Sequence, residues 1–412
     1  MVTKYDVFEI IYKNKIFRPI DIVNKLGRSE KDYKNIHRIL VELEENKLLI
    51  KTEEGFEINK NNKSKSLYEI IYFCLSNDIN YNLLLDKNLI QFVFNGLRRG
   101  EINQKNTNVN PRTFTKYFKI LDKYGLLLWT SKKPLRARIF YNTLINNLLV
   151  YFDFGHLNLK KISEDYISEV EKGLSVYKRL RKKNEIGFQK IVNEFEVYFV
   201  HHSLSLEGNP ITLPDTVKIL RDKIIPANLK THDVDALKNY QNTILIMLRD
   251  AQSGKQLTIE GILNYHKIAM AHEPEIAGKI REVEVHIKKN PNFMVSKAEN
   301  VRKDLEALFI KYNNFVKKKT SIKEIINFAS YFHNEFQHIH PFVDGNSRTT
   351  RLITFHLLHL KGIPILDIPF GLLDDYMNQT KGSKNRDDKN FAQSLGRIIL
   401  FNIKKINEKL SI

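Results

Sequence analysis

Pro341 restricts the fold of this chain more than any other residue, because it must stop a long amphipathic helix. A capping box at Ser321 and Glu324 starts that helix. Proline disfavours a helical conformation in the residue before it, so His340 should lie on a loop with an extended backbone. The apolar residues of the helix recur at helical spacing: Ile325, Ile326, Phe328, Ala329 and Phe332.

A second helix follows within a few residues. Gly345 permits a tight or left-handed turn, and the helix should begin near Asn346 and end at Gly362. Its apolar positions are Leu352, Ile353, Phe355, Leu357 and Leu360. The loop after the first helix therefore leads directly into a helix N-terminus.

The residues around this loop are of the types that bind phosphate. Free N–H groups at a helix start attract anions, and Arg348 and Arg351 are spaced to share one face of the helix. Asp344 can hold Mg²⁺, which prefers one or two carboxylates together with phosphate oxygens. His340 can accept a proton near neutral pH. These residues predict a site for nucleotidyl or phosphoryl transfer. Two other interpretations stay open: a metal site at His333, His338 and His340, or a stable helix–loop–helix whose charges face water.

The run HPFVDGNSRTTR, from His340 to Arg351, resembles the signature of the Fic (filamentation induced by cAMP) family, HPF-x-[DE]-GN-x-R-x-x-R. Ser347 departs from it, because the family often has glycine or lysine there. The resemblance extends over about residues 187–400. It implies a helical domain that transfers AMP from ATP to a Ser, Thr or Tyr hydroxyl of a target protein.

The resemblance also implies a role for each motif residue. His340 would remove the proton from the target hydroxyl, and Asp344 would bind Mg²⁺ on the α- and β-phosphates. Tyr376 would lie against adenine, where many relatives have a Tyr-Tyr pair and this chain has Asp375 before the tyrosine. The expected nucleotide-binding residues are Gly345, Asn346, Arg348, Arg351 and Tyr376.

Residues 278–287, GKIREVEVHI, resemble the flap strand of the family. Val283 and Val285 alternate with Glu284, as in a half-buried strand. In the family, a small β-hairpin of this kind holds the target segment by strand addition. An ordinary core hairpin is the alternative.

The run SLSLEGNPITL resembles the inhibitory motif [ST]xxxE[GN] of Fic proteins that carry it before the core, with Ser203, Glu207 and Gly208 at the motif positions. The resemblance implies that Glu207 pairs with Arg351. A carboxylate there would compete with the γ-phosphate of ATP and repel it. The alternative is an ordinary helix end at Gly208. In some relatives the same glutamate supports removal of AMP, so the reverse reaction stays open.

Two N-terminal stretches resemble winged helix-turn-helix modules. Residues 4–58 predict three helices and a hairpin, and a helix at 111–124 is followed by strand-like runs. Residues 101–150 hold nine Lys/Arg against two Asp/Glu, which suits contact with DNA phosphates. Modules that bind proteins or dimerise are the alternative, and Glu30 and Asp32 dilute the charge of the first module. The predicted DNA contacts are Arg112, Lys116, Lys119, Lys123, Lys132, Lys133, Arg136 and Arg138.

We therefore predict a mainly α chain. Winged helix-turn-helix-like modules occupy 1–60 and 61–150, a helical connector 151–186, and a Fic domain with its inhibitory helix 187–412. The formal net charge of +19 suits a polyanionic partner. Cys74 is the single cysteine, so an intrachain disulfide is excluded. Without a signal-peptide pattern or a run of about 20 apolar residues, we expect a cytoplasmic protein with no membrane partner. A homodimer stays open.

The leading hypothesis is a self-inhibited protein adenylyltransferase that uses ATP and Mg²⁺. One alternative is a DNA-binding transcription regulator whose Fic domain senses a nucleotide. Another is a Fic enzyme that transfers UMP, phosphocholine or phosphate, or that removes AMP.

Overall fold

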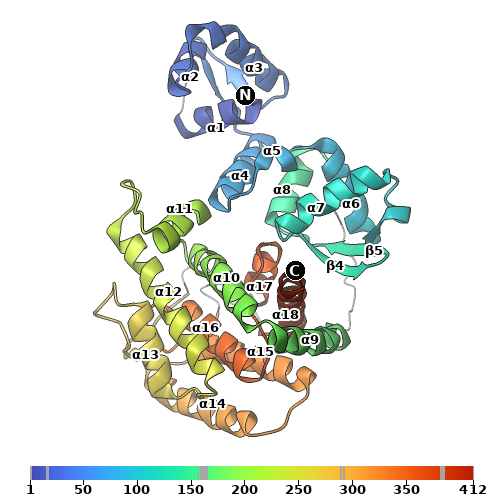
Figure 1. Cartoon of the computed structure of the whole chain (residues 1–412). Coiled ribbons are helices and arrows are strands. Elements are labelled where there is room, and N and C mark those ends of the chain that lie inside the picture. The colour runs from blue at the N-terminus through green and yellow to red at the C-terminus, as the bar shows by residue number, and fades with distance from the viewer. Residues whose placement is uncertain are drawn as a thin grey trace. The chain divides into compact units, whose positions relative to one another are not determined.

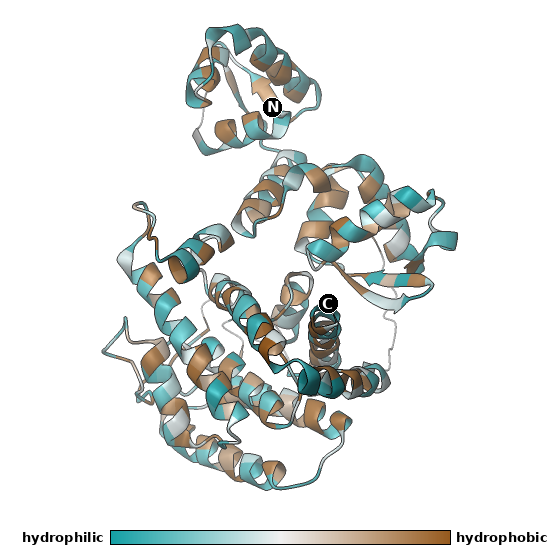
Figure 2. Cartoon of the chain, in the orientation of Figure 1, coloured by the Kyte–Doolittle hydropathy of each residue, from teal (hydrophilic) through white to brown (hydrophobic). Residues whose placement is uncertain are grey.

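The chain is mainly helical, as predicted (Figure 1). A computed structural model describes residues 2–14, 18–155, 157, 166–287, 290, 293–380 and 386–411. The chain divides into two compact units, Met1–Ile162 and Ser163–Ile412. Helices in both units carry hydrophilic and hydrophobic residues side by side (Figure 2), as expected of amphipathic helices that bury one face.

The first unit begins with three α-helices and a hairpin. These elements are α1 (Lys4–Asn14), α2 (Pro19–Lys25), α3 (Tyr33–Glu45), β1 (Leu49–Lys51) and β2 (Phe56–Ile58). The two strands pair antiparallel, with Leu49 opposite Ile58. The helices and hairpin predicted for residues 4–58 are therefore present, and their assignment to the winged helix-turn-helix class stays a prediction.

The rest of the first unit combines helices with a small antiparallel sheet of order β3-β5-β4. The helices are α4 (Asn62–Ser76), α5 (Tyr81–Leu84), α6 (Lys87–Arg99), α7 (Pro111–Lys123) and α8 (Thr143–Tyr151). The strands are β3 (Ile102–Asn103), β4 (Leu127–Lys132) and β5 (Leu135–Ile139). The Asn110 side chain accepts a hydrogen bond from the Thr113 N–H, 2.8 Å away, and so caps the predicted helix α7.

The described residues of the second unit form helices joined by loops and contain no strand. Its α-helices are α9 (Tyr166–Lys183), α10 (Glu185–Ser205), α11 (Leu213–Val217), α12 (Thr231–Gln252), α13 (Ile259–Ala269), α14 (Val301–Val316), α15 (Ile322–Ile339), α16 (Asn346–Leu360), α17 (Leu373–Gln379) and α18 (Asp388–Leu410). α16 lies between α12 and α15 and is buried from Asn346 to Leu358, so it forms the centre of the core (Figure 1). α9 packs along α18, so this part of the predicted connector belongs to the second unit.

The predicted β-hairpin flap is not formed by the described part of residues 278–287, which contains no strand. The backbone N–H of Arg281 donates instead to the Pro341 carbonyl, 2.9 Å away. Its guanidinium binds the carbonyls of His340 and Val283 at 2.7 and 2.8 Å. The segment is thus held by one buried arginine against the loop between α15 and α16. The strand predicted from the alternating valines is therefore wrong. No described strand lies beside this segment to pair with its backbone.

None of the helices in the described ranges is both long enough and apolar enough to cross a bilayer.

Candidate active site

His340 ends α15 in a left-handed conformation, with φ 50° and ψ 60°. The expectation of an extended backbone is therefore wrong. The His340 N–H still donates to the Phe336 carbonyl, 3.0 Å away, so the residue closes the last helical turn before Pro341. A left-handed residue other than glycine costs about 1–2 kcal/mol, and such strain is concentrated at functional sites.

The ring of His340 is oriented by a backbone carbonyl. Its Nδ1 lies 3.1 Å from the Gln337 carbonyl oxygen. A carbonyl can only accept a hydrogen bond, so in the neutral ring Nδ1 carries the proton and Nε2 the lone pair. The side chain is half-buried. His340 is therefore held in the tautomer of a general base that acts through Nε2.

Asn346 closes the loop that leads into α16. Its Oδ1 accepts from the Phe342 N–H at 2.9 Å, and its Nδ2 donates to the Phe342 carbonyl at 2.7 Å. Gly345 precedes the helix with φ +80°, a conformation that glycine adopts without a steric penalty. The buried Asn346 side chain thus shapes the turn, and the helix N-terminus behind it can bind an anion.

Asp344 presents an exposed carboxylate beside this N-terminus. Its side chain is 68% exposed, whereas that of Arg348 is 9% exposed. Asp344 Oδ1 accepts from the Gly345 N–H at 2.7 Å, and Oδ2 accepts from Arg348 Nη2 at 3.1 Å. One positioned carboxylate suits Mg²⁺ that also binds nucleotide phosphates. Such a site needs no cluster of three protein ligands, and none occurs among the residues that the structure describes.

Arg351 is fully buried and binds the end of α10. Its Nη2 donates to Glu207 Oε1 at 3.0 Å and to the Ser203 carbonyl at 2.9 Å. Its Nε donates to Ser203 Oγ at 2.6 Å. Burial by itself lowers the pKa of Arg351. The nearby Glu207 carboxylate raises this pKa, and the net effect is a rise. The structure therefore brings together the arginine and the two residues expected to form an inhibitory contact, while Gly208 follows in a left-handed turn at φ +93°.

A chain of hydroxyl groups continues from this contact to the motif helix. Ser203 Oγ donates to Tyr240 Oη at 2.8 Å, and Tyr240 Oη donates to the Arg348 carbonyl at 3.3 Å. Burial raises the pKa of Tyr240, so its phenol stays protonated and can donate. In the sequence, Tyr240 belongs to an apolar stripe of α12. The spacing of this stripe does not predict the hydrogen bonds of the Tyr240 hydroxyl.

Tyr376 lies in the core, where it lines the same small cavity as Arg351. Its hydroxyl is 2.8 Å from His333 Nε2, and its ring packs against Phe391. Burial raises the pKa of Tyr376 to about 12. With 3% of its surface exposed, the side chain offers no open ring face, so the expected contact with adenine is not supported by its position.

The alternative metal site at three histidines is not formed among the described residues. His333 is enclosed between Asn334 and Tyr376, whereas the ring of His338 packs against Phe293. His340 is turned to the Gln337 carbonyl. The three rings therefore point to different partners, as expected once Pro341 ends the helical register.

Comparison with known proteins places this site in a family. The Fic/DOC family model matches residues 256–358, which include α13, the loop and most of α16. Residues 256–358 form a Fic domain. The protein adenylyltransferase Fic of Nematostella vectensis is 32% identical over 213 residues, which are 49% of this chain and 47% of that protein. The protein of the same name from Drosophila melanogaster is 30% identical over 212 residues, 48% of this chain and 40% of its own length. The chain thus spans less than half the length of these curated relatives.

A solved structure supports the fold. A Fic domain containing signaling protein from Bacteroides thetaiotaomicron superposes with a TM-score of 0.53 at 20% identity, covering 59% of this chain and 97% of that one. At this identity the likeness concerns the fold alone.

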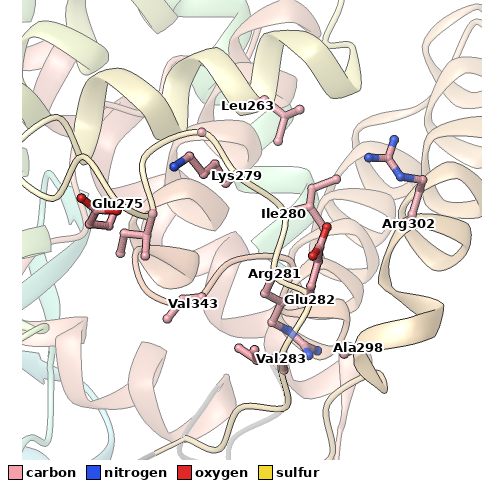
Figure 3. Close-up of a pocket in the computed structure, with 12 residues that line it drawn as sticks. Leu263, Glu275, Lys279, Ile280, Arg281, Glu282, Val283, Ala298, Arg302 and Val343 are labelled. Atoms are coloured by element: carbon pink, nitrogen blue, oxygen red, sulfur yellow. Dashed lines mark hydrogen bonds between the residues drawn. The ribbon is translucent and has the colours of Figure 1, made fainter.

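A pocket of about 640 Å³ lies beside the motif loop of the Fic domain (Figure 3). Arg281, Val283 and Val343 line it, and Arg302 of α14 contributes to its rim. Val283 is 56% exposed and Val343 45% exposed, so apolar side chains of the segment and the loop are open to a partner. Glu284, also exposed, accepts a hydrogen bond from the Ala298 N–H at 2.9 Å, and Val285 is half-buried.

The predicted DNA contacts lie in the first unit. Arg112, Lys116, Lys119 and Lys123 are all exposed and recur on one side of α7, whose other side packs Phe114, Tyr117, Phe118 and Leu121 into the core. The β4–β5 hairpin adds Lys132, Lys133 and Arg136, which are exposed, and Arg138, which is half-buried. Arg98 and Arg99, which were not predicted, are exposed at the end of α6. The basic side chains therefore form a surface on a helix and its neighbouring hairpin.

Proposed function

We propose that the second unit is a protein adenylyltransferase, which moves AMP from ATP to a Ser, Thr or Tyr hydroxyl of a target protein. The observation that carries this proposal is the placement of His340. Its Nε2 lone pair is set by the Gln337 carbonyl, directly before the loop that leads into the anion-binding start of α16. The relatives named protein adenylyltransferase Fic support the same reaction.

In the proposed reaction the His340 Nε2 takes the proton of the target hydroxyl. The hydroxyl oxygen then attacks the α-phosphorus, the bond to the β-phosphate oxygen breaks, and pyrophosphate leaves. The N–H groups at the start of α16 and the Arg348 guanidinium would hold the phosphates. Mg²⁺, when bound at Asp344, would neutralise charge on the nucleotide.

Segment 278–287 is proposed to hold the target. The described residues show no ladder partner for its backbone after Arg281, so an extended target segment can pair with it. Val283, Glu284 and Val285 are the residues expected at this contact. The apolar side chains of Val283 and Val343 would cover side chains of the target beside the His340 loop.

The contact between Glu207 and Arg351 is proposed to inhibit the enzyme. Arg351 is the second arginine of the motif, and Glu207 occupies its Nη2 in place of a phosphate oxygen. A carboxylate at this position repels the γ-phosphate of ATP, so the nucleotide would bind without alignment for attack.

The transferred group is tested with two labelled forms of ATP. The Glu207→Gly variant is incubated with Mg²⁺ and either [α-³²P]ATP or [γ-³²P]ATP, and protein-bound label is measured. Label from the α-position alone supports AMP transfer, and label from the γ-position would show phosphate transfer instead. If neither label is transferred while ATP is bound, the Fic domain is a nucleotide sensor and the adenylyltransferase proposal is wrong.

A second function, DNA binding by the first unit, is supported by the exposed basic stripe of α7. Charge reversal of Lys116 and Lys119 to Glu should weaken binding of a random-sequence duplex about tenfold or more. It should also reduce the slope of log affinity against log salt by about two, because two phosphate contacts are lost. Fluorescence anisotropy at increasing KCl measures both quantities.

The control for this experiment is Lys65→Glu on α4, an exposed residue of the same unit outside the stripe. It should leave the salt slope unchanged. A loss of log affinity in Lys65→Glu about half that in the double variant would indicate attraction by net charge rather than by α7, because one charge reversal is compared with two. Absence of DNA binding in the unaltered chain would leave protein contacts as the role of these modules.

A cytoplasmic location and a homodimer stay predictions.

A further inference from the structure

His266 of α13 connects the Fic loop to the proposed target-binding segment. Its side chain is completely buried. The Gly278 N–H donates to His266 Nδ1 at 2.9 Å, so Nδ1 must be unprotonated. Nε2 then carries the proton and donates to the Asp344 carbonyl, 2.9 Å away. The two hydrogen bonds together require a neutral ring, since one ring nitrogen donates and the other accepts.

The same ring also contacts the loop on either side of Asp344. It stacks on Phe342, with ring centres 3.6 Å apart and planes inclined by 6°. A Cβ atom on Gly345 would lie 2.9 Å from His266 Nε2, which is closer than such contacts are found. The ring therefore fits closely against three residues of the HPFVDGN loop.

The hydrogen bond to the Asp344 carbonyl determines where the Asp344 carboxylate lies. This carbonyl and the Gly345 N–H belong to one planar trans peptide, so they point in opposite directions. Holding the carbonyl on His266 turns the N–H to the other side, where it donates to Asp344 Oδ1 at 2.7 Å. Arg348 holds Oδ2 at 3.1 Å. His266 thus acts on the carboxylate through one rigid peptide.

We infer that His266 is a positioning residue, which orients the Asp344 carboxylate toward Mg²⁺-bound nucleotide and links this carboxylate to the target-binding segment at Gly278. The inference rests on the proposed function, because it assigns the carboxylate to the nucleotide. A partner that orients a metal-binding carboxylate affects metal affinity or activity about 10–100-fold when it is removed.

Two conservative substitutions separate the hydrogen bonds of His266. In His266→Gln the side-chain N–H₂ reaches about as far as the imidazole Nε2 and can still donate to the Asp344 carbonyl. In His266→Asn the shorter side chain can keep only the acceptor for the Gly278 N–H. Both variants lose the stacked ring, so the difference between them reports on the carbonyl contact.

The variants are compared in the Glu207→Gly background. His266→Asn should lower kcat for AMP transfer about 10–100-fold and raise the Mg²⁺ concentration needed for binding a fluorescent ATP analogue about tenfold or more. His266→Gln should stay within about threefold of the parent in both measurements. Equal values for the two variants would overturn the inference, because a merely structural role does not distinguish the donor from the acceptor.

His359 provides the matched control. It lies at the other end of α16, and its Nε2 also binds a backbone carbonyl, that of Ile365, at 2.5 Å. His359→Asn and His359→Gln should change the melting temperature without separating in kcat or in Mg²⁺ requirement. A comparable separation at His359 would show that loss of stability alone produces the effect.

Two readouts keep the inference independent of the enzyme's activity and of the variants' folding. If Glu207→Gly transfers no AMP, the proposed function fails, whereas the Mg²⁺ requirement for ATP binding still tests His266. If the variants do not fold, ¹⁵N spectra of imidazole-labelled unaltered chain at pH 7 decide. A neutral ring protonated on Nε2 supports the inference, and a charged or Nδ1-protonated ring overturns it.

Discussion

Replacing Glu207 with glycine is expected to raise the rate of AMP transfer about 100-fold. Glu207 pairs with the buried Arg351 at 3.0 Å, and a hydrogen bond between charged groups contributes about 1.5–3 kcal/mol. The unpaired arginine can then bind the γ-phosphate, and about 3 kcal/mol corresponds to roughly a 100-fold change in the population competent for transfer. Initial rates with [α-³²P]ATP and Mg²⁺ measure it.

The same substitution should have opposite effects on stability with and without nucleotide. Without ATP the buried Arg351 loses its counter-charge, so Glu207→Gly should lower the melting temperature. With ATP the variant should gain more stability than the unaltered chain, because it binds the ligand more tightly. Thermal melts at several ATP concentrations test both signs. Glu207→Gln, which keeps a hydrogen bond without the charge, should give an intermediate rate.

Glu185→Gly is the matched control for Glu207→Gly. Glu185 begins α10 and pairs with Arg181 at 3.3 Å in a largely exposed bridge, so it contributes little stability. An increase in transfer by Glu185→Gly would mean that loosening α10 is sufficient. No increase in Glu207→Gly, with AMP transfer still detectable, would refute inhibition by this contact.

The sequence predicts the helices around the site well, because local signals set their ends. The capping box at Ser321 is present, with Ser321 Oγ accepting from the Glu324 N–H at 3.3 Å, and α15 stops before Pro341. Gly345 and Gly362 bound α16 as expected. The rule that a residue before proline is extended fails at His340. The His340 N–H donates to the Phe336 carbonyl, and this hydrogen bond favours the left-handed conformation.

The residues that the sequence does not predict as functional are buried polar groups on apolar stripes. Tyr240 and His266 occupy core positions of α12 and α13, and their helical spacing indicates packing alone. Their polar contacts depend on which loop lies across each helix, and this is tertiary information. A weak signal exists for His266, because a fully buried histidine must find hydrogen-bond partners for both ring nitrogens. The flap fails for a similar reason, since alternation of valines cannot supply a partner strand.

Replacing His340 is expected to reduce AMP transfer roughly 10³-fold in the Glu207→Gly background. A positioned general base contributes about 10²–10⁴-fold, and the target hydroxyl has no other acceptor assigned to it. His340→Ala removes the base but also places alanine in a left-handed conformation, which costs about 1–2 kcal/mol. His340→Asn is therefore the sharper variant, since asparagine tolerates this conformation and still lacks the imidazole. Initial rates of label transfer measure the effect.

The outcome separates catalysis from binding and folding. Because the Gln337 carbonyl orients the His340 side chain, His340→Asn should leave the affinity for ATP within about threefold of the parent. His232→Ala, an exposed histidine on α12 that pairs with Glu273, should leave transfer unchanged and so controls for the loss of any histidine. Full transfer by His340→Asn would remove His340 as the base. A proportional fall in ATP affinity would instead assign His340 to nucleotide binding, and the proton would then have to leave by another acceptor.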